Sequence, residues 1–131
     1  MIYRSIILAS YNQQCCITGL KISNLLVASH IIPWKINKKE RLNPHNGLCL
    51  NSLHDKAFDM GLLTITKDYR IRLSSKIKEQ AKEIPIKELF YKYENQKIIL
   101  PDRFLPSVAF LEYHFEEVFQ KWVNHIFLLS I

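Results

Sequence analysis

Three polar groups follow one another at fixed intervals in the first half of the chain. His30 stands in the run Ala-Ser-His-Ile-Ile-Pro-Trp, Asn46 comes 16 residues later, and His54, Asp55 and Asp59 lie 8 to 13 residues beyond it. An imidazole is well suited to accept a proton at neutral pH, and carboxylates are ligands of hard divalent ions. The order of these groups indicates a site that activates water beside a cation, as phosphodiester hydrolysis requires.

The spacing of the acidic residues predicts how they would share one divalent ion. Asp55 and Asp59 are four residues apart and therefore lie on the same face of a helix. Carboxylate oxygens favour Mg²⁺ or Mn²⁺, whereas the addition of His54, about 100° round the helix, would also admit Zn²⁺ or Ni²⁺. Asn46 can bridge strand and loop through its amide, and so hold the loop that carries His30.

The elements that must position these groups are predicted by local patterns. Residues 25–32 are rich in Leu, Val and Ile and read as a strand ended by Pro33, and residues 47–50 read as a second strand. Ser52 is expected to cap a helix that begins near Leu53 and ends at Gly61. The site region is therefore predicted to run strand, loop, strand, helix.

The flanking sequence predicts a mixed α+β fold in one domain spanning residues 1–131. A helix is expected before the site region, and a small second hairpin and several helices after it. The expected ranges are helices 2–12, 74–83, 86–93 and 108–122, a hairpin of 62–66 with 70–73, and a short strand at 98–100.

Composition favours a polyanionic partner. The net charge is +6, which favours polyanions such as nucleic acid or anionic lipid. Four cations, Lys35, Lys38, Lys39 and Arg41, crowd the segment between His30 and Asn46, where they place positive potential beside the site and are candidates for binding nucleic-acid phosphates. No uncharged apolar stretch is long enough for a membrane span, so a cytoplasmic protein with no membrane partner is expected.

The three cysteines argue against disulfides and against a four-cysteine zinc site. Cys15 and Cys16 are adjacent, the count is odd, and no Cys-x-x-Cys pair occurs. Reduced thiols are expected, with Cys16 and Cys49 as small buried apolar residues. Trp34 is expected to pack as a core or loop anchor.

Taken together, the motifs resemble the HNH endonucleases of the ββα-metal fold. The segments that carry this resemblance are Cys16-Ile17-Thr18-Gly19, Ala28 to Trp34, Asn46 to Leu50, and Phe58-Asp59, within a core motif of about 11–65 followed by a helical extension of about 74–131. The resemblance implies an HNH core with additional helices and a second small hairpin.

The resemblance also implies roles for individual residues. His30 matches the general base, and Asn46 matches the asparagine that braces the loop. The third motif position falls at His54 or Asp55, so that His54 is both a catalytic and a metal candidate, and Asp55 and Asp59 are metal ligands. Ser29 stands where relatives commonly carry an Asp or His ligand.

These expectations amount to a DNA endonuclease of restriction type that depends on one divalent metal ion and that acts as a homodimer if it cuts both strands. Two alternatives remain open. One is a non-catalytic nucleic-acid-binding module with an HNH-like fold, which Ser29 favours. The other is a structural or interaction domain, which the apolar residues 126–131 favour.

Overall fold

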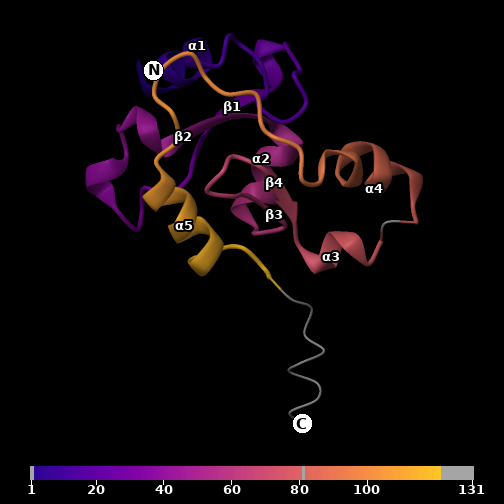
Figure 1. The fold of residues 1–131 in the computed structure, drawn as a ribbon. Coiled ribbons are helices and arrows are strands. Elements are labelled where there is room, and N and C mark those ends of the chain that lie inside the picture. The colour runs from indigo at the N-terminus through magenta and orange to yellow at the C-terminus, as the bar shows by residue number, and fades with distance from the viewer. Residues whose placement is uncertain (1, 81, 122–131) are drawn as a thin grey trace.

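An antiparallel hairpin and the helix that follows it form the centre of the molecule. The computed structural model describes residues 2–80 and 82–121. Strand β1 (Leu26–His30) pairs with β2 (Gly47–Asn51), with Leu26 opposite Asn51 and His30 opposite Gly47. Helix α2 (Ser52–Asp59) follows β2 directly (Figure 1). The predicted order of strand, loop, strand and helix is confirmed.

A first helix covers this hairpin. Helix α1 (Ile2–Ser10) contacts both β1 and β2, and α2 also contacts both strands (Figure 1). All five residues of β2 are buried, which explains why its sequence is nearly all apolar instead of alternating. On α1, Ile7 and Leu8 point into the protein and are at most 1% exposed.

Helix α2 begins and ends with residues suited to those places. Asn51 is the N-cap, because its side chain accepts a hydrogen bond from the backbone N–H of His54 at 2.9 Å. The helix thus starts one residue earlier than predicted, with Asn51 and not Ser52 as its cap. Gly61 has a φ of +74° just after the helix, as the sequence predicted, and a Cβ there would lie 2.1 Å from the carbonyl oxygen of Val118.

The second hairpin is also present. Strand β3 (Leu63–Ile65) pairs antiparallel with β4 (Ile71–Leu73). The last helix, α5 (Val108–Glu117), contacts β3, so the hairpin joins the C-terminal part of the chain to the site region (Figure 1).

Several predicted elements are shorter than expected. Helix α3 covers only Ser75–Lys78, and α4 covers Ile84–Leu89 with Pro85 in its first turn, followed by a 3₁₀ turn at Tyr91–Tyr93. Further 3₁₀ turns cover Ser23–Leu25, Lys38–Glu40 and Pro44–Asn46.

Two further predictions are wrong. The strand expected at 98–100 does not form, because the N–H groups of Ile98 and Ile99 bond to different segments, at Tyr69 and Cys16. Helix α5 ends at Glu117, and the chain then turns so that the Gln120 N–H reaches the carbonyl of Gly61. Residues 122 and 126–131, for which a helix end and a packing surface were considered, lie outside the described residues.

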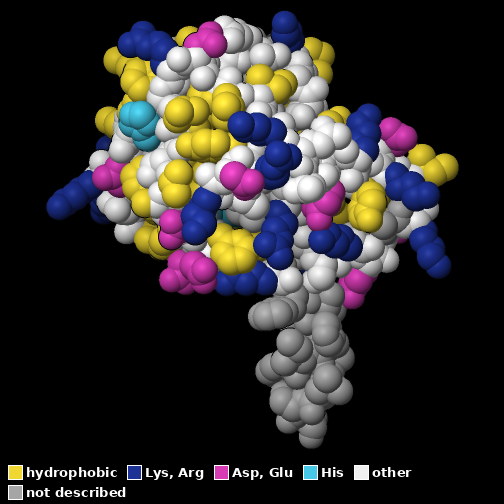
Figure 2. Space-filling model, in the orientation of Figure 1, with side chains coloured by type: hydrophobic (Ala, Val, Ile, Leu, Met, Phe, Trp, Pro, Cys, Tyr) yellow, Lys and Arg dark blue, Asp and Glu magenta, His cyan; other side chains and the backbone are white. Residues whose placement is uncertain are grey.

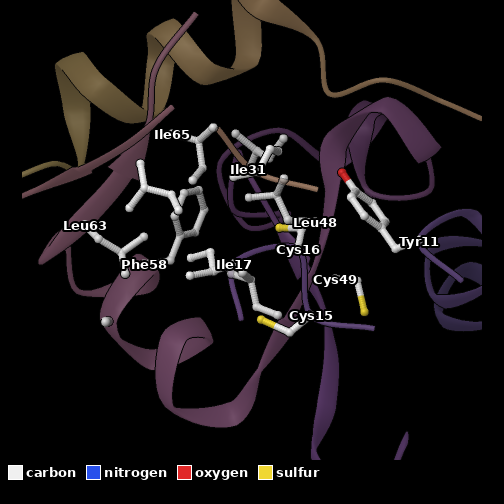
Figure 3. Close-up of a cluster of buried hydrophobic side chains, with 14 of the residues drawn as sticks. Tyr11, Cys15, Cys16, Ile17, Ile31, Leu48, Cys49, Phe58, Leu63 and Ile65 are labelled. Carbon is white, nitrogen blue, oxygen red and sulfur yellow. The ribbon is translucent and has the colours of Figure 1, made fainter. Parts of the chain in front are cut away.

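One hydrophobic core joins these elements. Figure 3 shows side chains from several segments pointing toward one another, among them Phe58 of α2, Leu48 of β2 and Ile65 of β3, all fully buried. Cys15, Cys16 and Cys49 are buried and form no disulfide with one another, and the predicted burial of Cys16 and Cys49 is confirmed. None of the described helices has the length and hydrophobicity needed to cross a membrane.

Candidate active site

His30, Asp55 and Asp59 line one cleft of about 320 Å³. Strand β1 brings the histidine to the cleft at its last residue, and α2 contributes the two carboxylates. The remaining lining residues are Val27, Ala28, Ser29, Ile31, Pro33, Trp34, Lys35, His114 and Val118. Groups taken from two separate motifs of the sequence thus meet at one place in the fold.

The His30 ring is held at one edge and on one face. Its Nε2 lies 2.8 Å from the backbone oxygen of Arg41. Because a carbonyl oxygen only accepts hydrogen bonds, Nε2 carries the proton of the neutral ring, and Nδ1 keeps the free lone pair. The phenol ring of Tyr3 stacks on the imidazole, with centroids 4.6 Å apart and planes 6° apart. The arrangement leaves Nδ1 as the atom that can accept a proton.

Asn46 is fully buried and ties together the loop that follows His30. Its Oδ1 accepts from the N–H of Ile32 at 2.8 Å, and its Nδ2 donates to the carbonyl oxygens of Ile32 at 3.1 Å and Glu40 at 3.2 Å. These contacts are those of a brace. Asn46 does not line the cleft, so it acts on the site through the backbone it holds.

The two carboxylates on α2 repel one another. Partial desolvation in the cleft, and then the nearby Asp55 carboxylate, raise the pKa of Asp59 from 3.8 to about 6, while Lys56 opposes this. Two anionic oxygens that face one cleft are a donor set suited to a hard cation.

Ser29 adds a polar atom without a partner. Its side chain is 2% exposed and its Oγ has no hydrogen bond, although the residue lines the cleft. A buried hydroxyl without a partner is rare and costs stability. It fits a site in which a cation-bound water or a substrate oxygen supplies the missing contact.

His54 does not belong to this cleft, which corrects the prediction that it is a metal ligand and catalytic group. Its ring is 1% exposed, its Nδ1 accepts from Asn51 Nδ2 at 2.8 Å, and its Nε2 donates to the carbonyl of Leu89 at 2.6 Å. Both ring nitrogens are therefore occupied. The rotation of about 100° along α2 turns the ring toward a different cavity, lined by Tyr93 and other residues.

His114 was given no role from the sequence, yet it lines the cleft from α5. Its Nε2 donates to the carbonyl of Phe58 at 2.8 Å, and its Nδ1 accepts from the hydroxyl of Thr64 at 2.7 Å. Burial lowers its pKa from 6.5 to about 4, against the opposing effect of the bond to Phe58. The ring is therefore a neutral structural wall of the cleft.

The predicted nucleic-acid-binding cations lie on the loop between the two strands. Lys35, Lys38, Lys39 and Arg41 are all exposed, and Lys35 also lines the cleft. Trp34, expected to be a packing anchor, is instead 41% exposed at the cleft, with the guanidinium of Arg41 5.9 Å from its ring centre. Other parts of the surface are mixed, and Figure 2 shows Lys and Arg interleaved with Asp and Glu over one face.

The described residues contain no cluster of three or more His, Cys, Asp or Glu side chains arranged to hold a metal. Asp55 and Asp59 alone would therefore supply the charged ligands. Mg²⁺ is commonly bound through one or two carboxylates, with waters and substrate phosphates as its other ligands. The residues present thus fit a hard cation of this kind and do not form a closed structural metal site.

The site is built on a ββα arrangement, with a histidine at the end of β1 and two acidic residues on α2. In agreement with this, residues 15–66 match the family model of the HNH endonucleases. This part of the chain is therefore similar to the core of an HNH endonuclease.

Among solved structures, the chain is similar to one described as "Modification dependent TagI restriction endonuclease". The identity is 17%, the TM-score is 0.60, and the likeness covers 89% of this chain and 37% of that one. At this identity the likeness shows a shared fold. No curated protein matches the chain.

Proposed function

We propose that this chain hydrolyses phosphodiester bonds of DNA, with one divalent cation bound at Asp55 and Asp59 and with His30 as the general base. The observation that carries this proposal is the shared cleft, which is lined by two carboxylates and by a histidine whose Nε2 is bonded to the Arg41 carbonyl, so that Nδ1 is left to accept a proton. The family match of residues 15–66 supports the same activity.

His30 accepts the proton of the attacking water at Nδ1 in this proposal. The bond from Nε2 to the Arg41 carbonyl fixes the tautomer, and it also stabilises the imidazolium that forms, because Nε2 still donates to an oxygen. Asn46 keeps that carbonyl in place by bonding to the backbone at both ends of the loop.

Asp55 and Asp59 would hold Mg²⁺ or Mn²⁺, and Ser29 Oγ would bond to a water or phosphate oxygen beside it. When bound, the cation supplies positive charge to the phosphate oxygens and to the leaving group. The raised pKa of Asp59 supports this role, since two carboxylates that destabilise each other's charge gain most from a shared cation.

The loop between β1 and β2 would guide DNA to the cleft. Lys35, Lys38, Lys39 and Arg41 are exposed, and none of the four pairs with a carboxylate within residues 2–80 and 82–121. Free cations of this kind neutralise phosphates and release counterions, so binding should weaken as salt rises. Trp34 offers a half-exposed aromatic face beside them.

The test is cleavage of supercoiled plasmid with Mg²⁺ or Mn²⁺, with and without EDTA. His30→Ala should lose about 10²- to 10⁴-fold in rate, the usual contribution of a general base. His45→Ala is the matched control, because His45 lies outside the cleft lining, and it should retain activity. Cleavage that survives EDTA would overturn the metal dependence, and wild-type rates in His30→Ala would remove His30 from the mechanism.

We further propose a restriction role, which is supported by the similarity to a restriction endonuclease of which this chain spans 37%. Since the proposed site cuts one strand at a time, double-strand cleavage takes two copies, which we infer to meet on the DNA. Sedimentation of the His30→Ala protein with a short duplex should give two chains per duplex. A stoichiometry of one would contradict the dimer.

A further inference from the structure

Tyr3 contacts the proposed general base although it lies outside the residues that match the family. It stands on α1, and the match covers residues 15–66. Its ring stacks on the ring of His30, and its hydroxyl donates to the backbone oxygen of Asn46 at 2.9 Å. One side chain therefore touches both the base and the residue that braces the loop of the base.

The stack supplies a restraint that the other contacts of His30 lack. The hydrogen bond at Nε2 fixes the position of one ring atom of the imidazole. The χ2 torsion angle of histidine has a broad range of allowed values, so this bond alone does not set the ring plane. An aromatic face 4.6 Å away and nearly parallel sets the plane. The hydrogen bond at Nε2 and the stacked tyrosine together fix the orientation of the imidazole, and therefore the direction in which the Nδ1 lone pair points.

Helix α1 holds Tyr3 firmly against the hairpin. A Cβ at Gly47 would lie 2.5 Å from the Ile7 side chain and 2.6 Å from the hydroxyl of Tyr3, so these two side chains of α1 pack directly on the backbone of β2. Arg4 anchors the other side of the helix, donating to the carbonyls of Ser23 and Leu26. Burial raises the pKa of the Tyr3 phenol above its usual value, so the phenol remains a donor at neutral pH.

We propose that Tyr3 is a positioning residue for His30: its ring sets the imidazole plane, and its hydroxyl locks that ring to the backbone at Asn46. This inference rests on the proposed function of His30 as general base. Tyr3 does not line the cleft, so it acts on the reaction through His30 and touches neither water nor phosphate.

The kinetic test compares three substitutions under saturating Mg²⁺. Tyr3→Leu removes the aromatic face and should lower kcat about 10-fold or more, with KM for DNA nearly unchanged, because misplacement of a reacting group costs rate and not binding. Tyr3→Phe keeps the ring and should stay within about threefold of the wild type, the loss of one hydrogen bond being modest.

Arg4→Gln is the matched control on the same helix. It loosens α1 without touching His30, and its kcat should stay near that of the wild type. An equal fall of kcat in Arg4→Gln and Tyr3→Leu would overturn the positioning role, since it would mean that any loosening of α1 has the same effect. All assays are run well below the thermal unfolding midpoint of the least stable variant.

An NMR measurement tests the stack without any cleavage. The ring protons of His30 should show upfield shifts from the tyrosine ring current in the wild type and in Tyr3→Phe, and lose them in Tyr3→Leu. The ¹⁵N shifts of the ring should report the Nε2–H tautomer in the wild type and a mixture in Tyr3→Leu. Unchanged His30 signals in Tyr3→Leu would refute the proposal. A wild type that shows these signals but cuts no DNA would refute the proposed function while leaving the stack intact.

Discussion

Acid should destabilise this protein through His114. In the folded protein the pKa of His114 is about 4 instead of 6.5, because the ring is buried between Phe58 and Thr64. The unfolded chain therefore binds a proton at His114 at a pH where the folded protein does not. Between pH 6.5 and pH 4, lowering the pH favours the unfolded state.

The size of the effect follows from the shift. A difference from 6.5 to about 4, at about 1.4 kcal/mol per pKa unit, gives about 3 kcal/mol lost between pH 7 and pH 4. A domain of this size is commonly stable by about 5–15 kcal/mol, so the loss is a large share of the total. It comes from a residue that also forms a wall of the cleft.

Urea unfolding of the wild type and of His114→Gln, at pH 7, 6, 5 and 4, measures the effect. Glutamine can replace both hydrogen bonds but does not titrate. From pH 7 to pH 4, the wild type should lose about 3 kcal/mol more of its free energy of unfolding than His114→Gln does. The raised pKa of Asp59 acts with the opposite sign between about pH 4 and pH 6, but both proteins carry Asp59, so the comparison cancels it.

A direct titration of the His114 ring signals by NMR is the control, with an expected midpoint near 4. If the midpoint lay near 6.5, or if the two proteins lost stability in parallel, the reasoning from burial would be refuted.

Three further outcomes are expected. Asn46→Ala removes three hydrogen bonds to the loop and should lower the free energy of unfolding by about 2–4 kcal/mol; a loss under 1 kcal/mol in urea would show that Asn46 is no brace. Mn²⁺ affinity, measured by calorimetry, should fall as the pH drops through 6, since protons compete for Asp59, and this dependence should be weaker in Asp59→Asn. His54→Ala should lower the free energy of unfolding by about 2–3 kcal/mol, because it leaves Asn51 and Leu89 without their hydrogen-bond partner. It should still bind Mn²⁺ as the wild type does. Loss of Mn²⁺ binding in this variant would show that His54 is a metal ligand.

The part of the site that the sequence predicted depends on local geometry. Asn46 precedes β2, and the register sets Gly47 opposite His30, so a hairpin brings the two motifs together with no help from distant residues. Asp55 and Asp59 share a helix face because they are four residues apart. Spacing alone was sufficient to predict that His30, Asp55 and Asp59 belong to one site, and all three line one cleft.

The prediction for His54 was wrong for a reason that spacing cannot reveal. The residue is the third of α2, where its backbone N–H bonds to the N-cap Asn51 and its ring turns back toward that cap. Its other nitrogen meets the carbonyl of Leu89, 35 residues further along. A rotation of 100° between neighbouring helix positions decides which cavity a side chain reaches.

Tyr3 and His114 were missed because their contacts are long-range. Tyr3 reaches Asn46 across 43 residues, and His114 reaches Phe58 across 56. Each lies in a segment predicted only to be a helix, and in the structure Tyr3 is partly buried and His114 is buried. Only the tertiary arrangement shows that His114 lines the cleft and that Tyr3 stacks on His30, which lines it.

The contacts of α1 and α5 determine how much of the chain must be included when this domain is fused to another protein. The plane of the His30 ring is set from α1, and the last turn of α2, which carries Asp59, is held by the stack of Phe58 on His114. A fusion limited to residues 15–66 would lack Tyr3, which stacks on His30, and His114, which stacks on Phe58 next to Asp59. A fusion of this domain to a DNA-binding module should therefore include α1 and α5 together with the residues of the family match.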